Sequence, residues 1–182
     1  INCELFIIKA MSKSRAIIFL TLVLIIAGGL RLYHLDRLPP GLYPDEAMNG
    51  NNATEAISTG DYKIFYPENN GREGLFINIQ AAFIQLLGGG KPWVLRLPSA
   101  LIGILTVLGM YFLGRELFSK RVGLLASFFL ATSFWHINFS RIGFRAIMAP
   151  LLLVWAIYFF LHAIRRHSDQ KNFPALFYAG LA

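Results

Sequence analysis

The segment RLPSALIGILTVLGMYFLGRELF, residues 96–118, is the most informative about the fold. Within it, residues 98–114 carry no acidic or basic side chain and are rich in Leu, Ile, Val and aromatic residues. About 20 mostly apolar residues are enough for a helix to cross the hydrocarbon core of a bilayer, with some latitude for tilt. The pattern therefore predicts a membrane-spanning helix.

The composition of the whole chain agrees with this interpretation. Its 182 residues are 55% hydrophobic and only 15% charged, whereas soluble domains carry about a quarter charged residues. The net charge of +7 comes mostly from short basic clusters between apolar runs, where Lys and Arg act as topology signals. No basic groove with interleaved aromatic residues is visible, so no nucleic acid partner is expected. The single cysteine, Cys3, excludes an internal disulfide and a Cys-based zinc site.

These features predict an all-α polytopic integral membrane protein, interpreted as the N-terminal piece of a longer one. The N-terminus, 1–15, is expected in the cytoplasm, and its residues 1–10 are interpreted as non-native. Transmembrane helices are expected at 16–33, 98–114, 122–139 and 148–164, with the truncated start of a fifth at 173–182. The loops between them are expected to be external at 34–97 and 140–147 and cytoplasmic at 115–121 and 165–172.

The segment Gly74–Leu87 is apolar but short, and it carries Asn78, Gln80 and Gln85. If it does not span, every short basic cluster falls on the cytoplasmic side, as the positive-inside rule requires. If it spans, the cluster 115–121 is exported. We therefore expect an interfacial helix in the large first external loop. Arg31, near the outer end of the first span, is expected to snorkel to the membrane surface.

Seven of the ten acidic residues lie between Asp36 and Glu73, in this loop. Asp45 and Glu46 follow Pro44, a pattern that predicts a helix running to about Thr59, although the pair Asn49-Gly50 favours a turn. Helix capping accounts for both carboxylates. Alternatively, one of them accepts a proton from an attacking hydroxyl just above the membrane. Adjacent acids could also hold a divalent cation, but two alone make a weak site, and no metal site is predicted.

Two more charged groups lie on the same predicted side. Arg72 and Glu73 either pair with each other at the surface, a contact worth little, or Arg72 binds a lipid phosphate. Arg141 and Arg145 are external, against the positive-inside trend. Either the anionic headgroups of membrane lipids or the phosphate of a bound substrate accounts for them. His136 is expected to be a packed side chain rather than a metal ligand.

Taken in order, YPDEA, GREGLF, RLPSALIGILTVLGMYFLGRELF and HINFSRIGFR resemble the first part of the PMT/ArnT-like bacterial glycosyltransferases of the membrane GT-C superfamily. The resemblance covers about residues 16–165. It implies a GT-C type transmembrane helix bundle in the cytoplasmic (inner) membrane, with its active loop on the extracytoplasmic side. It also implies transfer of a hexose or pentose from a polyprenyl-phosphate donor to a lipid, glycan or protein acceptor, generally with inversion.

By this resemblance Asp45 is the catalytic base, with Glu46 beside it in the paired acidic motif. Arg72, Arg141 and Arg145 are the cations available to the donor phosphate, and Glu73 lies beside the first of them. The chain departs from the family where it reads Arg72-Glu73-Gly74, because O-mannosyltransferases and the aminoarabinose transferase have His-Pro-Pro or Lys-Pro-Pro there.

No cofactor is assigned, and residues 1–182 alone are expected to be inactive, because they supply too little of a donor cavity. Two other classes remain open. A transporter or flippase would place ionisable groups at mid-membrane, and none is visible in the predicted spans. A noncatalytic scaffold would not need an Asp-Glu pair in this loop.

Overall fold

The computed structural model describes residues 11–68 and 71–167 of the chain. The described residues are mostly helical, as predicted. The helices are α1 (Lys13–Leu32), α2 (Pro44–Thr59), α3 (Gly74–Leu87), α4 (Pro92–Leu117), α5 (Lys120–Thr132), α6 (Phe134–Arg141), the short 3₁₀ helix η1 (Arg145–Ile147) and α7 (Met148–His167). Two short strands, β1 (Phe65–Tyr66) and β2 (Arg72–Glu73), pair antiparallel. The predicted fifth helix at 173–182 and the N-terminal residues 1–10 lie outside the described residues.

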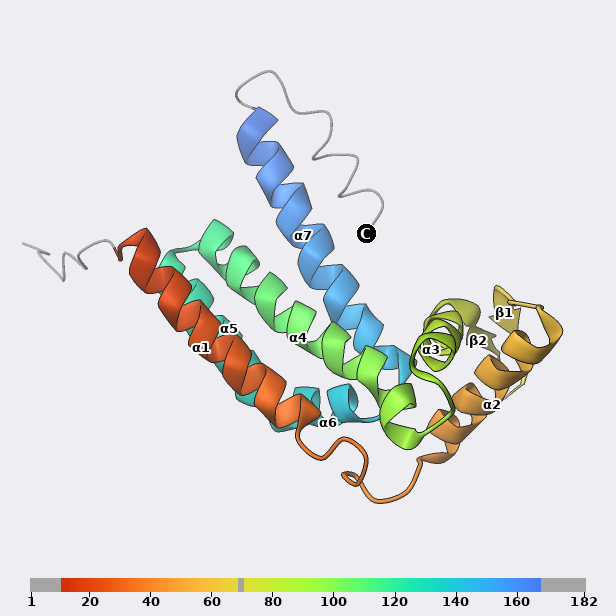
Figure 1. Cartoon of the computed structure of the whole chain (residues 1–182). Helices are drawn as coiled ribbons and strands as arrows, with labels where there is room; N and C mark the ends of the chain where they lie inside the picture. The colour runs from red at the N-terminus through yellow and green to blue at the C-terminus, as the bar shows by residue number, and fades with distance from the viewer. Residues whose placement is uncertain (1–10, 69–70, 168–182) are drawn as a thin grey trace, which may run out of the picture.

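The long helices form a bundle, and the short elements gather at one end of it. Figure 1 shows α1, α4 and α5 side by side, with α7 meeting α4 at one end and diverging from it toward the other. The helices α2 and α3 and the β1–β2 hairpin lie beside the end of the bundle where α4 and α7 begin. Charged side chains from distant parts of the chain can therefore meet there.

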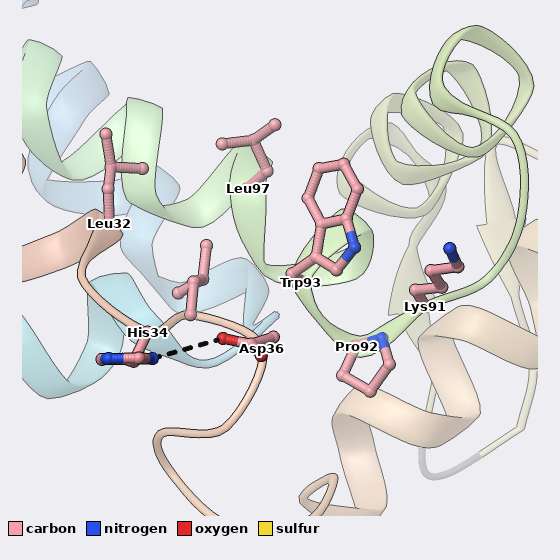
Figure 2. Close-up of a pocket in the computed structure, with 8 residues that line it drawn as sticks. Leu32, His34, Asp36, Lys91, Pro92, Trp93 and Leu97 are labelled. Carbon is pink, nitrogen blue, oxygen red and sulfur yellow. Dashed lines mark ion pairs between the residues drawn. The ribbon is translucent and has the colours of Figure 1, made fainter.

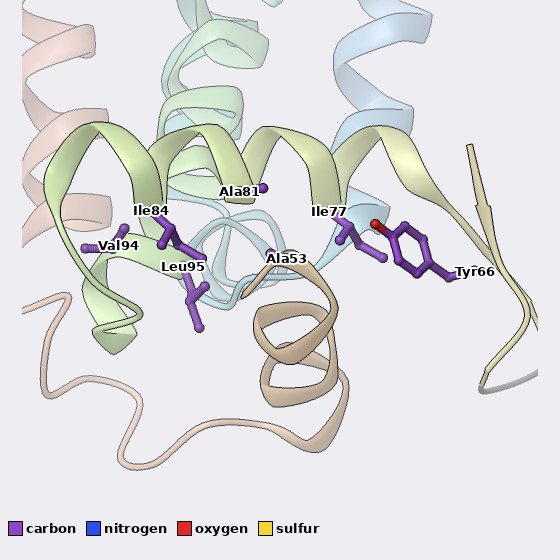
Figure 3. Close-up of a cluster of buried hydrophobic side chains, with 7 residues drawn as sticks. All are labelled: Ala53, Tyr66, Ile77, Ala81, Ile84, Val94 and Leu95. Atoms are coloured by element: carbon purple, nitrogen blue, oxygen red, sulfur yellow. The ribbon is translucent and has the colours of Figure 1, made fainter. Parts of the chain in front are cut away.

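Three of the described helical segments are long and apolar enough to cross a membrane: α1, α4 and Arg145–Arg165. The bent pair α5–α6 would make a fourth span. The helix α3 covers the residues predicted for the short apolar helix, and Figure 3 shows it running across the helices behind it rather than beside them. Its location in the membrane interface stays a prediction.

The third span, predicted as one helix over 122–139, is broken at Ser133 into α5 and α6, which are bent by 59°. Because the helix ends there, backbone carbonyl groups at the end of α5 lack their usual helical hydrogen bonds. Two of these carbonyls accept hydrogen bonds from Arg31 of α1. Its Nη1 donates to Ala131 O at 3.0 Å and its Nη2 to Leu130 O at 3.4 Å. The apolar pattern of a single segment cannot reveal a break that a side chain from another helix stabilises.

Arg31 itself is completely buried, so the prediction that it snorkels to the membrane surface is wrong. Besides the two carbonyls, it donates to Ser140 Oγ at 3.2 Å and lies 2.7 Å from His136 Nδ1. A guanidinium can only donate, so Nδ1 is the acceptor and the imidazole proton sits on Nε2. His136 is thus a packed side chain, as predicted, and Arg31 joins α1 to both halves of the broken helix.

Glycines within residues 96–118 allow three helices to approach α4 closely. A Cβ at Gly103 would lie 2.2 Å from Ser140 Oγ in α6, and one at Gly109 would lie 2.8 Å from the Trp155 indole nitrogen in α7. At Gly114 the neighbour is the backbone of α5, 2.9 Å away. Small residues commonly line helix contacts in membranes, because lipid supplies no hydrophobic force between helices. These glycines therefore allow α5, α6 and α7 to pack closely against α4.

We predict that Gly103→Ala lowers the free energy of unfolding by about 1–3 kcal/mol, because Ser140 and Arg31 must move to make room. The matched control is Gly29→Ala in α1, where nothing lies within 4 Å of an added Cβ. That variant should be neutral or more stable by up to about 1 kcal/mol, since Ala favours helix over Gly. Reversible denaturation in mixed micelles measures both, and equal effects would contradict the close contact at Gly103.

Candidate functional site

The first candidate residues, Asp45 and Glu46, lie in the first turn of α2. Pro44 occupies the first helical position, and the Glu46 carboxylate accepts the backbone N–H of Tyr43 at 3.3 Å. The predicted helix is confirmed, and Asn49-Gly50 does not interrupt it. Gly50 packs against α4, where an added Cβ would lie 2.7 Å from Leu95 Cδ1. Tertiary packing has overridden the turn preference of this pair.

Glu46 forms a buried ion pair with Arg96 near the start of α4. Arg96 Nε donates to Oε1 at 2.7 Å and Nη2 to Oε2 at 3.2 Å, with the two side chains 0% and 1% exposed. Arg96 also donates to the carbonyls of Leu35 at 3.2 Å and Pro39 at 3.0 Å, and to that of Gly41. This pair fixes α2 and the loop that precedes it against α4.

Gly143, in the loop after α6, joins this pair to further polar groups. Its N–H donates to Glu46 Oε1 at 3.1 Å, and its carbonyl accepts from Asn49 Nδ2 at 3.2 Å. The Asn49 oxygen in turn accepts from Arg72 Nη1 at 2.6 Å. We call Glu46, Asn49, Arg72, Arg96 and Gly143 the Gly143 network. It connects four segments that are far apart in the sequence.

The backbone at Gly143 is in close contact on several sides. An added Cβ would lie 2.9 Å from Gln80 Nε2, 3.0 Å from Leu95 O and 3.1 Å from Glu46 Cγ. A residue with a side chain would therefore push the loop away from α2. The absence of a side chain at this position is what allows both backbone hydrogen bonds to form.

The Gly143 network is extended by an ion pair between Glu73 and Arg145, two residues beyond Gly143. Both side chains are accessible, Arg145 at 33% and Glu73 at 80%. They border a cavity of about 560 Å³ between the start of α3 and the start of α7. Its remaining lining is apolar: Leu75, Phe76, Phe144, Ala146, Met148, Ala149 and Leu152. We call it the Arg145 cavity.

The structure separates the two neighbouring acids. Successive residues of an α-helix point about 100° apart, and here Glu46 faces the protein interior while Asp45 is partly exposed. Both oxygens of Glu46 are engaged by Arg96 and by backbone N–H groups. Glu46 is therefore a structural anchor, and Asp45 is the member of the pair that an incoming molecule can reach.

Arg141 has a different position from Arg145. It is 9% exposed, and it donates to backbone carbonyls at and after the end of α1. The acceptors are Leu30 at 2.8 Å, Tyr33 at 2.7 Å, Leu38 at 3.0 Å and His34 at 3.4 Å. These bonds supply a structural reason for a cation here that needs no phosphate. Arg72 is also buried and bonded to Asn49, and it does not pair with Glu73. Of the three predicted cations, Arg145 is the most accessible.

Sequence reasoning missed Arg96 and Asn49 as members of this site. Arg96 begins the segment 96–118, but no local signal indicates that its side chain faces a carboxylate 50 residues earlier. The weak available signal was that Glu46, an acid at the start of an amphipathic helix, needs a partner if that face is buried.

The residues present do not fit a metal site. No three His, Cys, Asp or Glu side chains within residues 11–68 and 71–167 lie together as a metal-binding group. In addition, the oxygens of Glu46 are already used by Arg96 and by N–H donors. Asp45 and Glu46 cannot share a cation in this arrangement.

An apolar cluster holds the site against the bundle. Its members are Ala53, Tyr66, Ile77, Ala81, Ile84, Val94 and Leu95 (Figure 3). They come from α2, β1, α3 and α4, so the cluster joins the elements that carry the charged groups. Burial raises the pKa of the Tyr66 hydroxyl above its ordinary value, and this hydroxyl donates to Asn78 Oδ1 at 3.4 Å.

A second cavity, of about 730 Å³, lies between the turn after α1 and the start of α4. Figure 2 shows His34 and Asp36 on one side, with Nδ1 and Oδ1 3.9 Å apart, and Pro92 and Trp93 on the other. None of the six predicted site residues lines it. The Arg145 cavity is therefore the better candidate for substrate.

The bundle, with three helices and one bent pair that are long and apolar enough to cross a membrane, defines a multi-pass membrane protein. Residues 75–182 match the family model described as dolichyl-phosphate-mannose-protein mannosyltransferase, and the chain belongs to this family. It is accordingly a membrane glycosyltransferase. The match includes Arg96, Arg141 and Arg145 but begins after Asp45, Glu46, Arg72 and Glu73. No curated protein and no solved structure matches the chain significantly.

We predict that Glu46→Gln lowers the free energy of unfolding by about 3–5 kcal/mol, because it leaves the Arg96 guanidinium buried without a counter-charge. The matched change at the neighbouring acid, Asp45→Asn, should cost about 0.5 kcal/mol or less, since Asn is also favourable near a helix start. Denaturation in mixed micelles compares the two variants. A Glu46→Gln protein as stable as Asp45→Asn would contradict the anchoring role.

Proposed function

We propose that the protein transfers a sugar from a polyprenyl-phosphate donor to a hydroxyl of a lipid, glycan or protein acceptor, with inversion, on the extracytoplasmic side of the cytoplasmic membrane. Asp45 is the general base and Arg145 binds the donor phosphate. The main support for the proposal is the pair of hydrogen bonds between α2 and Gly143. They join the helix that bears Asp45 to the loop that leads into η1 and Arg145.

The Arg145 cavity suits the donor. An apolar space of this kind with a guanidinium at its rim fits an amphiphile that has an anionic head. Arginine binds phosphate oxygens through two parallel N–H donors, and the apolar lining accepts the first isoprene units. Since the phosphate is already a good leaving group, the main tasks are to hold it and to stabilise the charge it gains.

Asp45 suits activation of the acceptor. As the acceptor oxygen forms its bond to C1 of the sugar, Asp45 takes the hydroxyl proton, and the C1–O bond to phosphate breaks with its electron pair leaving on the phosphate. Attack opposite the leaving phosphate inverts the configuration at C1. Fixed positions for base and phosphate-binding cation supply the orientation that such a reaction requires.

The buried cation Arg31 does not favour a transporter. A proton- or ion-coupled transporter uses ionisable groups in its membrane helices that exchange their charge partners during the cycle. Arg31 is instead fixed by carbonyls from α1 and α5 and by two side chains of α6. Arg31 therefore has a structural role, because it holds α1, α5 and α6 together. A transferase does not require such a residue to change partners.

We predict that Asp45→Asn, in the protein as its gene encodes it, lowers turnover by about a hundredfold or more, because a general base commonly contributes that much. The donor KM should stay nearly unchanged, since the phosphate meets Arg145. Sugar transfer is measured in reconstituted vesicles with a labelled donor. Asp61→Asn, in the same loop, is the matched control and should keep full turnover. Full turnover in Asp45→Asn would exclude its role as the base.

The proposed topology gives a separate prediction. Ser58 in α2 and Ser119 between α4 and α5 are both exposed, and the basic clusters place them on opposite sides of the membrane. In a Cys3→Ser background, Ser58→Cys should react with an impermeant thiol reagent in intact cells, and Ser119→Cys should react only after permeabilisation. Labelling of position 119 in intact cells would overturn the topology.

A further inference from the structure

The cation of the Arg145 cavity is covered by a carboxylate. Arg145 Nη1 donates to the Glu73 carboxylate, so a phosphate that approaches Arg145 must compete with Glu73 for the guanidinium. Glu73 occupies the N-cap position of α3, where an acidic side chain would ordinarily accept an N–H of the first turn. It makes no such capping bond. Its carboxylate is directed across the rim of the cavity instead.

The backbone of Glu73 is held while its side chain can move. In β2 the side chains of Arg72 and Glu73 point to opposite faces, as in any strand. Arg72 is 2% exposed and anchored on Asn49, whereas the Glu73 side chain is 80% exposed. A carboxylate on a fixed backbone with free space around it can leave Arg145 without disturbing the Gly143 network.

We propose that Glu73 is a displaceable counter-ion of the donor site. It neutralises Arg145 when the cavity is empty, yields to the phosphate of the entering lipid, and returns when the product leaves. This proposal rests on the proposed function, because it takes a polyprenyl phosphate as the ligand. An ion pair between accessible side chains is weak because water screens it, so the exchange costs little.

The return of Glu73 matters most after transfer. The donor is a phosphodiester with one negative charge, whereas the product, a polyprenyl monophosphate, carries about −1.5 to −2 at neutral pH. The product therefore binds Arg145 more strongly than the donor does. A carboxylate that competes for the same guanidinium weakens product binding and speeds its release.

The experiment measures the dissociation constant of polyprenyl monophosphate for the protein, as its gene encodes it, in nanodiscs by native mass spectrometry. Glu73→Gln should bind the lipid roughly twofold to fivefold more tightly, because the competitor is gone. The matched control is Glu68→Gln, which removes one negative charge from an acid 4.0 Å from Arg72 in the same loop. It should leave the constant unchanged. Binding of the uncharged polyprenol should not respond to either change.

The outcomes separate the two proposals. If the wild-type protein binds the monophosphate and Glu73→Gln binds it equally well, or Glu68→Gln tightens binding as much, the counter-ion role is wrong and the donor site stands. If Arg145→Gln binds the monophosphate as tightly as the wild type, or no variant binds it above polyprenol, the donor site itself is wrong. In the transfer assay, Glu73→Gln should lower the donor KM and also lower kcat where product release limits turnover.

Discussion

The buried ion pair between Glu46 and Arg96 is the constraint on which the polar end of the molecule depends. Removing two charges from water is costly, and the cost is offset only when every donor and acceptor finds a partner. Here Arg96 also meets three carbonyls of the loop before α2, and Glu46 meets the N–H groups of Tyr43 and Gly143. Displacing any of these segments would leave a buried charge short of partners, so four segments are fixed together.

Because of this constraint, neighbouring residues differ in exposure and in role. Glu46 and Arg72 are buried and set positions, while the residues beside them, Asp45 and Glu73, reach the surface. The helix separates the first pair by its 100° step, and the strand separates the second pair by its alternation. The two residues that we propose to face substrate are thus attached directly to residues that are buried and hydrogen-bonded. This is the arrangement that precise positioning of a reaction requires.

Local sequence signals predicted the helices, whereas contacts between distant segments determined the break in the third span and the role of Arg96. The bounds of α2 and α3 follow from Pro44, from the glycines that end both helices and from apolar length, so they could be read from the sequence. The break at Ser133 could not, because the group that stabilises it, Arg31, comes from α1. Asp45 and Arg145 were found as candidates because they are charged residues in loops predicted to be external, and because the family resemblance indicated Asp45 as the base. Arg96 was not assigned a role, because its partner is 50 residues away.

The departure from the family at Arg72-Glu73-Gly74 also has a physical reason. A Cβ at Gly74 would lie 1.9 Å from Lys63 O, and its N–H donates to Ile64 O at 2.6 Å. The proline that the resemblance to the O-mannosyltransferases and the aminoarabinose transferase led us to expect here would therefore clash and would also remove that hydrogen bond. The β1–β2 hairpin thus requires glycine at this position. The chain presents Glu73 on this hydrogen-bonded backbone, facing Arg145, which lies within the residues that match the family model.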